Sequence, residues 1–257
     1  MPTDLIFYAA AIPAVILVGL SKGGLGGAFG LMGVPILALV ISPIQAAAIM
    51  LPIMIAMDIA GLWAWRGHYD ATTLKVMLPG AVAGIGIGWL TAEFVTADII
   101  RLIVGVIAIL FVMRYAYDRY RTRNGNHAPP QQQNLAKGSF WATISGFTSF
   151  VTHAGGPPFQ LYTLPLKLDP KTYTGTSTRY FAVVNAIKLL PYFALGQFDA
   201  SNLATSAVLL PLAPLATFSG AWVVKRMHPE IFYPLMYLMI LATAIKLVAD
   251  GSDALFG

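Results

Sequence analysis

The stretch SKGGLGG, which spans Ser21–Gly27, interrupts an apolar run near the beginning of the chain. A second interruption of the same kind, THAGGPP, spans Thr152–Pro158, about 130 residues later and thus about half of the 257-residue length away. Each combines glycines with one cationic or titratable side chain, Lys22 in the first and His153 in the second. Membrane helices broken at corresponding points of two halves are a sequence signature of a transporter's substrate site. We therefore expect both stretches to line a site for a small ligand.

The composition is that of an integral membrane protein. Hydrophobic residues make up 57% of the chain and charged residues 11%, whereas a soluble domain carries about 25% charged residues. Several long apolar runs occur, which indicates more than one membrane crossing. The residues before the first run, Met1–Asp4, contain no lysine or arginine, which does not fit a cleaved signal peptide. The net charge of +5 is explained by basic cytoplasmic loops, so the sequence does not favour nucleic-acid binding.

Apolar segments occur in the same order in both halves of the chain. Those of the first half are Leu5–Leu20, Ala28–Ile41, Ala46–Trp65, Leu74–Leu90 and Ile99–Tyr117. Those of the second half are Phe140–Val151, Phe159–Leu166, Gly175–Leu195, Leu203–Val224 and Ile231–Val248. The segments beside each glycine interruption are shorter than the roughly 20 residues of a full span. Each half is therefore predicted to contain a glycine-broken pair of short helices, or a re-entrant hairpin, followed by three full transmembrane helices.

The two halves also correspond weakly in sequence. Pro43 and Pro170 are separated by 127 residues, and so are Asp58 and Asn185. Because each half has an odd number of net crossings, the second half must be inverted relative to the first. We therefore predict an all-α polytopic membrane protein with two inverted-topology repeats. The predicted divisions are membrane repeat 1 (residues 1–118), a cytoplasmic polar linker (119–137) and the inverted membrane repeat 2 (138–257).

The charged residues follow the positive-inside rule in this arrangement. Basic residues gather on the side of the linker, at Arg66, Lys75, Arg114, Arg119, Arg121, Arg123, Lys137, Lys167, Lys171, Lys225 and Arg226. Acidic residues gather on the opposite side, at Asp4, Glu93, Asp98, Asp199, Asp250 and Asp253. Arg101 is the main exception. The pattern predicts a multi-pass protein of the bacterial inner (plasma) membrane with both termini on the periplasmic or extracellular side.

The glycine interruptions offer backbone donors for an anion. Unwound backbone exposes N–H groups, and a helix N-terminus carries partial positive charge. The candidate donors are Gly23, Gly24, Gly26 and Gly27 in the first interruption and Ala154, Gly155 and Gly156 in the second. Pro157 and Pro158 lack an N–H group and suit the first turn of a following helix. The alternative explanation of the glycines is close helix packing through small residues.

Lys22 and His153 are the side chains within the interruptions that could hold a ligand. A charged group at bilayer depth costs at least about 2.5–3.5 kcal/mol and is usually functional. Alternatively, Lys22 lies near an interface and extends its ammonium to water. His153 could donate a hydrogen bond to an anion, carry a coupled proton, or simply bind backbone carbonyls that the break frees. A lone histidine without nearby Cys, Asp or Glu is a poor metal site.

Further polar residues fall inside the third apolar segment of each half. Asp58 could carry protons or pair with Lys22. Asn185 precedes Lys188 by three residues, so both face the same side of a helix. Arg179 falls roughly on that face as well and could extend a basic path, or it could lie near the cytoplasmic end of its helix and reach water.

The sequence shows no Ser-His-Asp order, no paired carboxylates and no metal-ligand spacing. We therefore predict that the protein is not an enzyme and that it holds no cofactor or metal. The expected partners are a small anion and the lipid bilayer, and a homo-oligomer is possible.

Short motifs accompany the two interruptions. They are VPIL (Val34–Leu37), ISPIQA (Ile41–Ala46), LPL (Leu164–Leu166), TGT (Thr174–Thr176) and VNAIKL (Val184–Leu189). With the interruptions, these motifs resemble the sulfite exporter TauE/SafE family, also called the 4-toluene sulfonate uptake permease family, over nearly the whole chain. The resemblance implies a secondary carrier of sulfite, sulfonates or related organosulfur anions. The pair Ser21-Lys22 departs from many relatives, which have small or apolar residues there.

The sequence thus predicts a secondary transporter that moves a small sulfur-containing anion, with export favoured, by alternating access around a site between the interruptions. The substrate-binding candidates are Lys22, Gly23, Gly24, Gly26, Gly27, His153, Ala154, Gly155, Gly156, Arg179, Asn185 and Lys188. The coupling candidates are Asp58 and His153. The alternatives are a proton-coupled uptake carrier, a channel for another small anion and a membrane subunit without transport activity.

Overall fold

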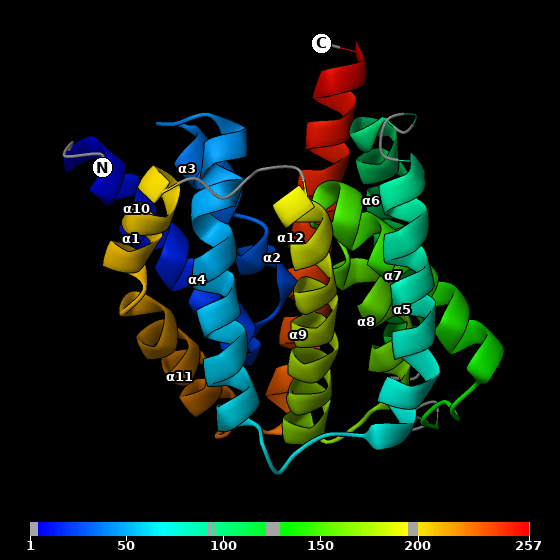
Figure 1. The fold of residues 1–257 in the computed structure, drawn as a ribbon. Helices are drawn as coiled ribbons and strands as arrows, with labels where there is room; N and C mark the ends of the chain where they lie inside the picture. Colours follow the sequence, from blue (N-terminus) through cyan, green and yellow to red (C-terminus); the bar gives the residue numbers. More distant parts are fainter. Residues whose placement is uncertain (1–4, 92–93, 95, 122–128, 195–199, 257) are drawn as a thin grey trace. The chain divides into compact units, whose positions relative to one another are not determined.

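The computed structural model describes residues 5–91, 94, 96–121, 129–194 and 200–256, and its described part is helical and free of strands (Figure 1). The first half contains α1 (Leu5–Leu20), the π-helical turn η1 (Ser21–Leu25), α2 (Gly27–Gly30), α3 (Gly33–Ala38), α4 (Pro43–Ala64), α5 (Ala71–Thr91) and α6 (Ala97–Arg121). The second half contains α7 (Leu135–Thr152), α8 (Gly156–Thr163), the 3₁₀ turn η2 (Leu164–Leu166), α9 (Pro170–Ala194), α10 (Ala200–Leu209), α11 (Leu212–Val224) and α12 (Pro229–Phe256). The all-α prediction is confirmed.

Within the described ranges, four helices are long and apolar enough to cross a membrane. They are Leu5–Leu25, Ala71–Thr91, Asp98–Tyr117 and Pro229–Ala254. A fifth candidate arises if α10 and α11, which meet at a bend of 45°, form one broken span. The chain therefore has several apolar helices of membrane-spanning length, as its composition predicts.

Two predicted segments are divided in the structure. The segment expected over Leu203–Val224 breaks between α10 and α11, where Pro211 immediately precedes the second helix and Pro214 follows in its first turn. Proline removes a helical donor and clashes with the preceding turn, so two prolines three residues apart explain the bend. The segment expected over Ala28–Ile41 is likewise two short helices, α2 and α3.

Side-chain caps fix the beginnings of two helices. Ser42 accepts a hydrogen bond from the Gln45 N–H at 3.3 Å, and Pro43 occupies the first turn of α4. Asn134 accepts one from the Lys137 N–H at 2.9 Å and so caps α7. Caps of this type satisfy N–H groups that have no partner inside the helix.

The end of α6 and the beginning of α7 lie inside the predicted linker, of which residues 122–128 are outside the described residues.

The chain packs as two compact units, and each draws elements from both halves of the sequence. Unit 1 consists of Met1–Asp70 and Pro170–Phe232, and unit 2 of Ala71–Asp169 and Tyr233–Gly257. The predicted repeats are two halves of the chain with matching segments, whereas each unit is a group of helices that pack together. The repeat boundaries therefore stay a prediction.

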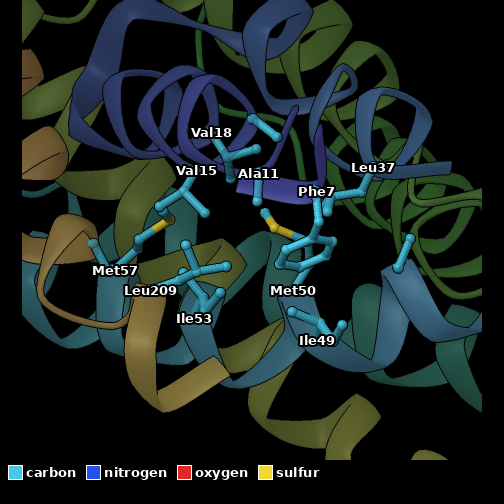
Figure 2. Packing of buried hydrophobic residues seen from close by; sticks show 13 residues of the cluster. Phe7, Ala11, Val15, Val18, Leu37, Ile49, Met50, Ile53, Met57 and Leu209 are labelled. Atoms are coloured by element: carbon cyan, nitrogen blue, oxygen red, sulfur yellow. The ribbon is translucent and has the colours of Figure 1, made fainter. Parts of the chain in front are cut away.

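Unit 1 is held by an apolar cluster between α1 and α4, which α3, α10 and α11 complete (Figure 2). Its labelled members are Phe7, Ala11, Val15, Val18, Leu37, Ile49, Met50, Ile53, Met57 and Leu209. Close to this cluster, Gly23 in η1 lies against α11, where an added Cβ would clash with the Thr217 carbonyl oxygen. The first glycine break thus packs closely against α11 of unit 1.

Unit 2 is built on a close contact between α5 and α7. Gly80 and Gly84 on α5 meet the backbone of α7 at Ser139 and Thr143, and Gly146 on α7 meets Ala81. Small residues at four-residue spacing let two helix backbones approach closely. These glycines therefore allow α5 and α7 to pack closely.

Candidate functional site

The first break begins where α1 passes into η1. Gly24 has φ 126° and Gly26 has φ 100°, values that glycine adopts at little cost and other residues rarely adopt. The Ser21 hydroxyl donates to the Gly26 carbonyl oxygen at 2.7 Å and closes the turn. The glycines are therefore required by the backbone path, which redirects the chain after Lys22.

Lys22 points into a buried polar cluster. Its Nζ lies 2.6 Å from Asp58 Oδ1 on α4, and the side chains of Lys22 and Asp58 are 18% and 7% exposed. The second carboxylate oxygen of Asp58 accepts a hydrogen bond from Asn185 Nδ2 on α9 at 2.7 Å. One of the roles considered for Asp58, pairing with Lys22, is present in the structure. Asp58 thus joins the first break to a helix of the second half.

Lys188 completes this cluster. It lies one helical turn after Asn185 on α9 and is 2% exposed. Its charge interacts with those of both Lys22 and Asp58. On the polar face expected from the spacing of Asn185 and Lys188, Asn185 is the residue that contacts Asp58. We call Lys22, Asp58, Asn185 and Lys188 the buried cluster.

Arg179 contacts a different part of unit 1. Its guanidinium donates to the carbonyl oxygens of Trp65 at 3.0 Å and Arg66 at 2.8 Å, just after α4 ends, and to that of Gly175 at 3.1 Å. It also lies 4.2 Å from the centre of the Tyr69 ring. A cation at a helix C-terminus satisfies free carbonyls and the helix dipole. Arg179 therefore caps α4, and none of these partners belongs to the buried cluster.

The contacts along α4 and α9 show that the two helices run in opposite directions. Asp58 is opposite Asn185, whereas Arg179, earlier in α9, reaches Trp65, later than Asp58 in the chain. Figure 1 shows the two helices, which pack against each other. An added Cβ at Gly61 would lie 2.9 Å from Thr178 Cγ2. A small residue there lets α9 approach α4 near the buried cluster.

The second break, in unit 2, has a different construction. α7 ends at Thr152, and His153 adopts the left-handed conformation with φ 56° and ψ 16°. The freed carbonyl oxygens of Ala154 and Gly155 accept hydrogen bonds from Thr148 at 3.2 Å and Ser145 at 2.7 Å. Hydroxyl groups of α7 thus satisfy the carbonyls of the break.

The donors of the second break divide into two groups. The N–H of Ala154 donates to the Thr148 carbonyl oxygen at 3.2 Å. By contrast, none of the described residues accepts a hydrogen bond from the N–H of Gly155 or Gly156. Pro157 and Pro158 occupy the first turn of α8, as their lack of N–H groups predicts. Of the three backbone donors predicted here, Ala154 is engaged within the protein.

The sequence match identifies the family. The family model described as sulfite exporter TauE/SafE matches residues 11–247. The chain belongs to the sulfite exporter TauE/SafE family. Comparison with curated proteins gives no match, and neither does comparison with solved structures.

Membership of the TauE/SafE family makes the protein a multi-pass membrane protein of a transporter family, in agreement with its apolar helices. It confirms the resemblance given by the sequence motifs. The buried cluster and both breaks lie inside the matched residues.

Two residues of the TauE/SafE chain have roles that the sequence did not reveal. Trp65 is fully buried, and its Nε1 donates to the Gly23 carbonyl oxygen at 3.3 Å, which fixes the first break to the end of α4. Ser145 holds the Gly155 carbonyl. Tryptophan suits a packing position as well as an interface, and serine often binds its own helix. Neither residue type predicts a hydrogen bond to a backbone carbonyl elsewhere in the chain.

Proposed function

We propose that the protein is a secondary transporter that moves a small sulfur-containing anion, sulfite or an organosulfonate, across the inner membrane by alternating access. Membership of the TauE/SafE family supports the substrate class. Export is the favoured direction, because an anion leaving a negative-inside cell gains about 2.3 kcal/mol per charge per 100 mV.

The observation that carries this proposal is the buried cluster beside the first helix break. Charged residues are costly inside membrane helices, so those retained there usually serve a ligand or ion path. Lys22 supplies an ammonium donor, and the non-helical glycines of η1 lie directly after it in the chain. Charge-assisted hydrogen bonds of this kind are roughly twice as strong as neutral ones. We propose that an anion binds here.

We propose a supporting role in anion binding for the second break as well. The N–H groups of Gly155 and Gly156 precede α8, and His153 lies beside them. Donors at the beginning of a helix favour an anion. This break belongs to unit 2 and is proposed as an anion contact of that unit by itself.

The packing of α4 and α9 supports the proposal of two inverted repeats. These helices begin at the corresponding prolines, Pro43 and Pro170, and they pack antiparallel. Asp58 and Asn185, which correspond at a spacing of 127 residues, are hydrogen-bonded to each other. Corresponding residues meet in this way when they lie on the axis that relates two inverted halves. The proposed topology places both termini outside, and a periplasmic reporter fused after Gly257 should be active.

Flux measurements in proteoliposomes test the proposal. A carrier should release internal sulfite faster when sulfite is present outside, whereas a channel should show no such exchange. Lys22→Gln keeps a hydrogen-bond donor for Asp58 but removes the charge, and should reduce the flux about tenfold or more. The matched control is Lys246→Gln, because Lys246 forms an ion pair with Asp250 at 2.7 Å on α12. Equal sulfite flux in protein-containing and empty vesicles would contradict the proposal.

A further inference from the structure

The C-terminal ends of α4 and α11, both in unit 1, combine exposed tryptophans with arginines. Trp63 on α4 is 62% exposed, and the guanidinium carbon of Arg66 lies 5.2 Å from the centre of its ring. Trp222 on α11 is 58% exposed, and the guanidinium carbon of Arg226 lies 4.0 Å from the centre of its ring. The same pairing therefore occurs at the ends of two helices.

Two contacts between α4 and α11 bring these ends together. The ring centres of Trp63 and Phe218 are 5.5 Å apart. Further along both helices, Lys225 Nζ lies 5.3 Å from the centre of the Trp65 ring. The two helices thus run in the same direction and end on the same side of unit 1 (Figure 1).

The cations at these helix ends are open to an anionic partner. Arg66, Lys225 and Arg226 are all exposed. No carboxylate among the described residues forms an ion pair with any of the three. Arg226 donates to the carbonyl oxygen of Trp222 on its own helix at 3.1 Å, which holds its guanidinium beside the ring.

An exposed apolar face leads up to these cations. On α4, Ile59 lies one turn before Trp63, and on α11, Leu215 and Phe218 lie one to two turns before Trp222. Spacings of three and four residues place each set on one side of its helix. Acyl chains fit such a face, and tryptophan is favoured at the boundary between acyl chains and headgroups.

We infer that this face of unit 1 binds an anionic phospholipid. Its phosphate contacts Arg66 and Arg226, with Lys225 adding positive charge, and its acyl chains lie along the apolar face. Guanidinium groups suit phosphate because they donate two parallel hydrogen bonds. The predicted topology places these helix ends on the cytoplasmic side, where basic residues between membrane helices bind anionic headgroups.

A third exposed tryptophan shows that a position at the membrane interface does not by itself explain the two pairs. Trp89 of α5 is 52% exposed, but no cation lies over its ring in the part of the chain that the structure describes. The arginines are thus specific to the face formed by α4 and α11. The inference goes beyond transport and does not depend on which anion is carried.

Native mass spectrometry of the purified full-length protein in neutral detergent tests the inference. The probes are dioleoyl phosphatidylglycerol, which is anionic, and dioleoyl phosphatidylcholine, which has the same acyl chains and no net charge. Each cation near an anionic headgroup should contribute about fivefold to affinity. The wild type should therefore prefer phosphatidylglycerol about twentyfold or more, and Arg66→Gln with Arg226→Gln should lose most of this preference.

The matched control is Lys75→Gln with Lys137→Gln. It also removes two exposed cations, from α5 and α7 of unit 2, and should keep the preference of the wild type. If the arginine variant keeps the full preference, or the wild type binds both lipids equally, the inference is wrong. If the arginine variant instead changes the oligomeric mass, a second copy of the chain covers this face, and the inference is likewise wrong.

Quenching of tryptophan fluorescence locates the lipid. At one molecule of acyl-brominated phosphatidylglycerol per protein, Trp63→Phe with Trp222→Phe should lose most of the quenching, whereas Trp89→Phe should retain it. The opposite result would place the lipid elsewhere and overturn the inference. None of these outcomes alters the flux expected for sulfite, so the proposed function is tested independently.

Discussion

The two glycine breaks both end one helix and begin another, but they use different residues to do so. The first uses two glycines with positive φ and places the charged pair Lys22–Asp58 beside the turn. The second uses left-handed His153 and satisfies its carbonyls with neutral hydroxyls from α7. A helix can therefore be interrupted with or without buried charge. The first break therefore requires an explanation for its charges that packing alone does not supply.

Loss of the carboxylate should have the largest effect. Asp58→Ala leaves the Lys22 ammonium without its partner in a buried site, and such changes cost about 3–5 kcal/mol. The free energy of unfolding in detergent should fall by this amount. The matched double variant, Lys22→Met with Asp58→Leu, removes both charges and should recover most of the loss. A change below about 0.5 kcal/mol in Asp58→Ala would show that the pair is effectively solvated.

The glycine requirement of the first break should give the next largest effect. Gly24→Ala forces a side chain into φ 126°, and its Cβ would lie 2.5 Å from Thr174 Cγ2. Strain of this type costs about 1–3 kcal/mol, which thermal unfolding can measure. Gly86→Ala is the control, because a Cβ at Gly86 meets nothing within 4 Å. Equal stability of the two variants would argue against the backbone path described for η1.

Some helix bounds can be predicted from the sequence and others cannot. The apolar run Leu5–Leu20 was predicted with the bounds that α1 has, because its composition changes sharply at Ser21. By contrast, Leu203–Val224 was expected to be continuous, since its hydropathy hides the bend at Pro211. Hydropathy reports burial in lipid, whereas a bend depends on one or two missing backbone donors.

The buried cluster was predictable in part. The charge of Lys22 and the matching positions of Asp58 and Asn185 single out three residues that contact one another in the structure. Their contact depends on how α4 packs against α9, which involves residues far apart in the sequence, such as Gly61 and Thr178. For Arg179, helical periodicity gave a face but not the reach of a long side chain, so its cap on α4 was missed.

The hydroxyls of the second break should contribute a moderate effect. Ser145→Ala leaves the buried Gly155 carbonyl without its donor, which costs about 1–3 kcal/mol. Ser219→Ala is the control, because Ser219 is exposed and donates to Leu215 of its own helix. Thermal unfolding of both variants checks the prediction. Equal midpoints would mean that the hydroxyl of Ser145 is not needed to hold this break.

The left-handed residue of the second break should give the smallest effect. Asn tolerates the left-handed conformation, whereas a β-branched residue does not, at a difference of about 1–2 kcal/mol. His153→Asn should therefore be more stable than His153→Val. If the two variants unfold at the same midpoint, the conformation at His153 differs from that described.

Cysteine protection can show whether an anion binds at the first break. The chain contains no cysteine, so Leu25→Cys in η1 and Glu230→Cys at an exposed position of α12 would each carry a single thiol. The rate of modification by a thiol reagent is measured with and without methanesulfonate. Bound anion should slow modification at Leu25→Cys and leave the rate at Glu230→Cys unchanged. Equal rates with and without the anion at Leu25→Cys, in protein that still binds methanesulfonate, would contradict anion binding at the first break.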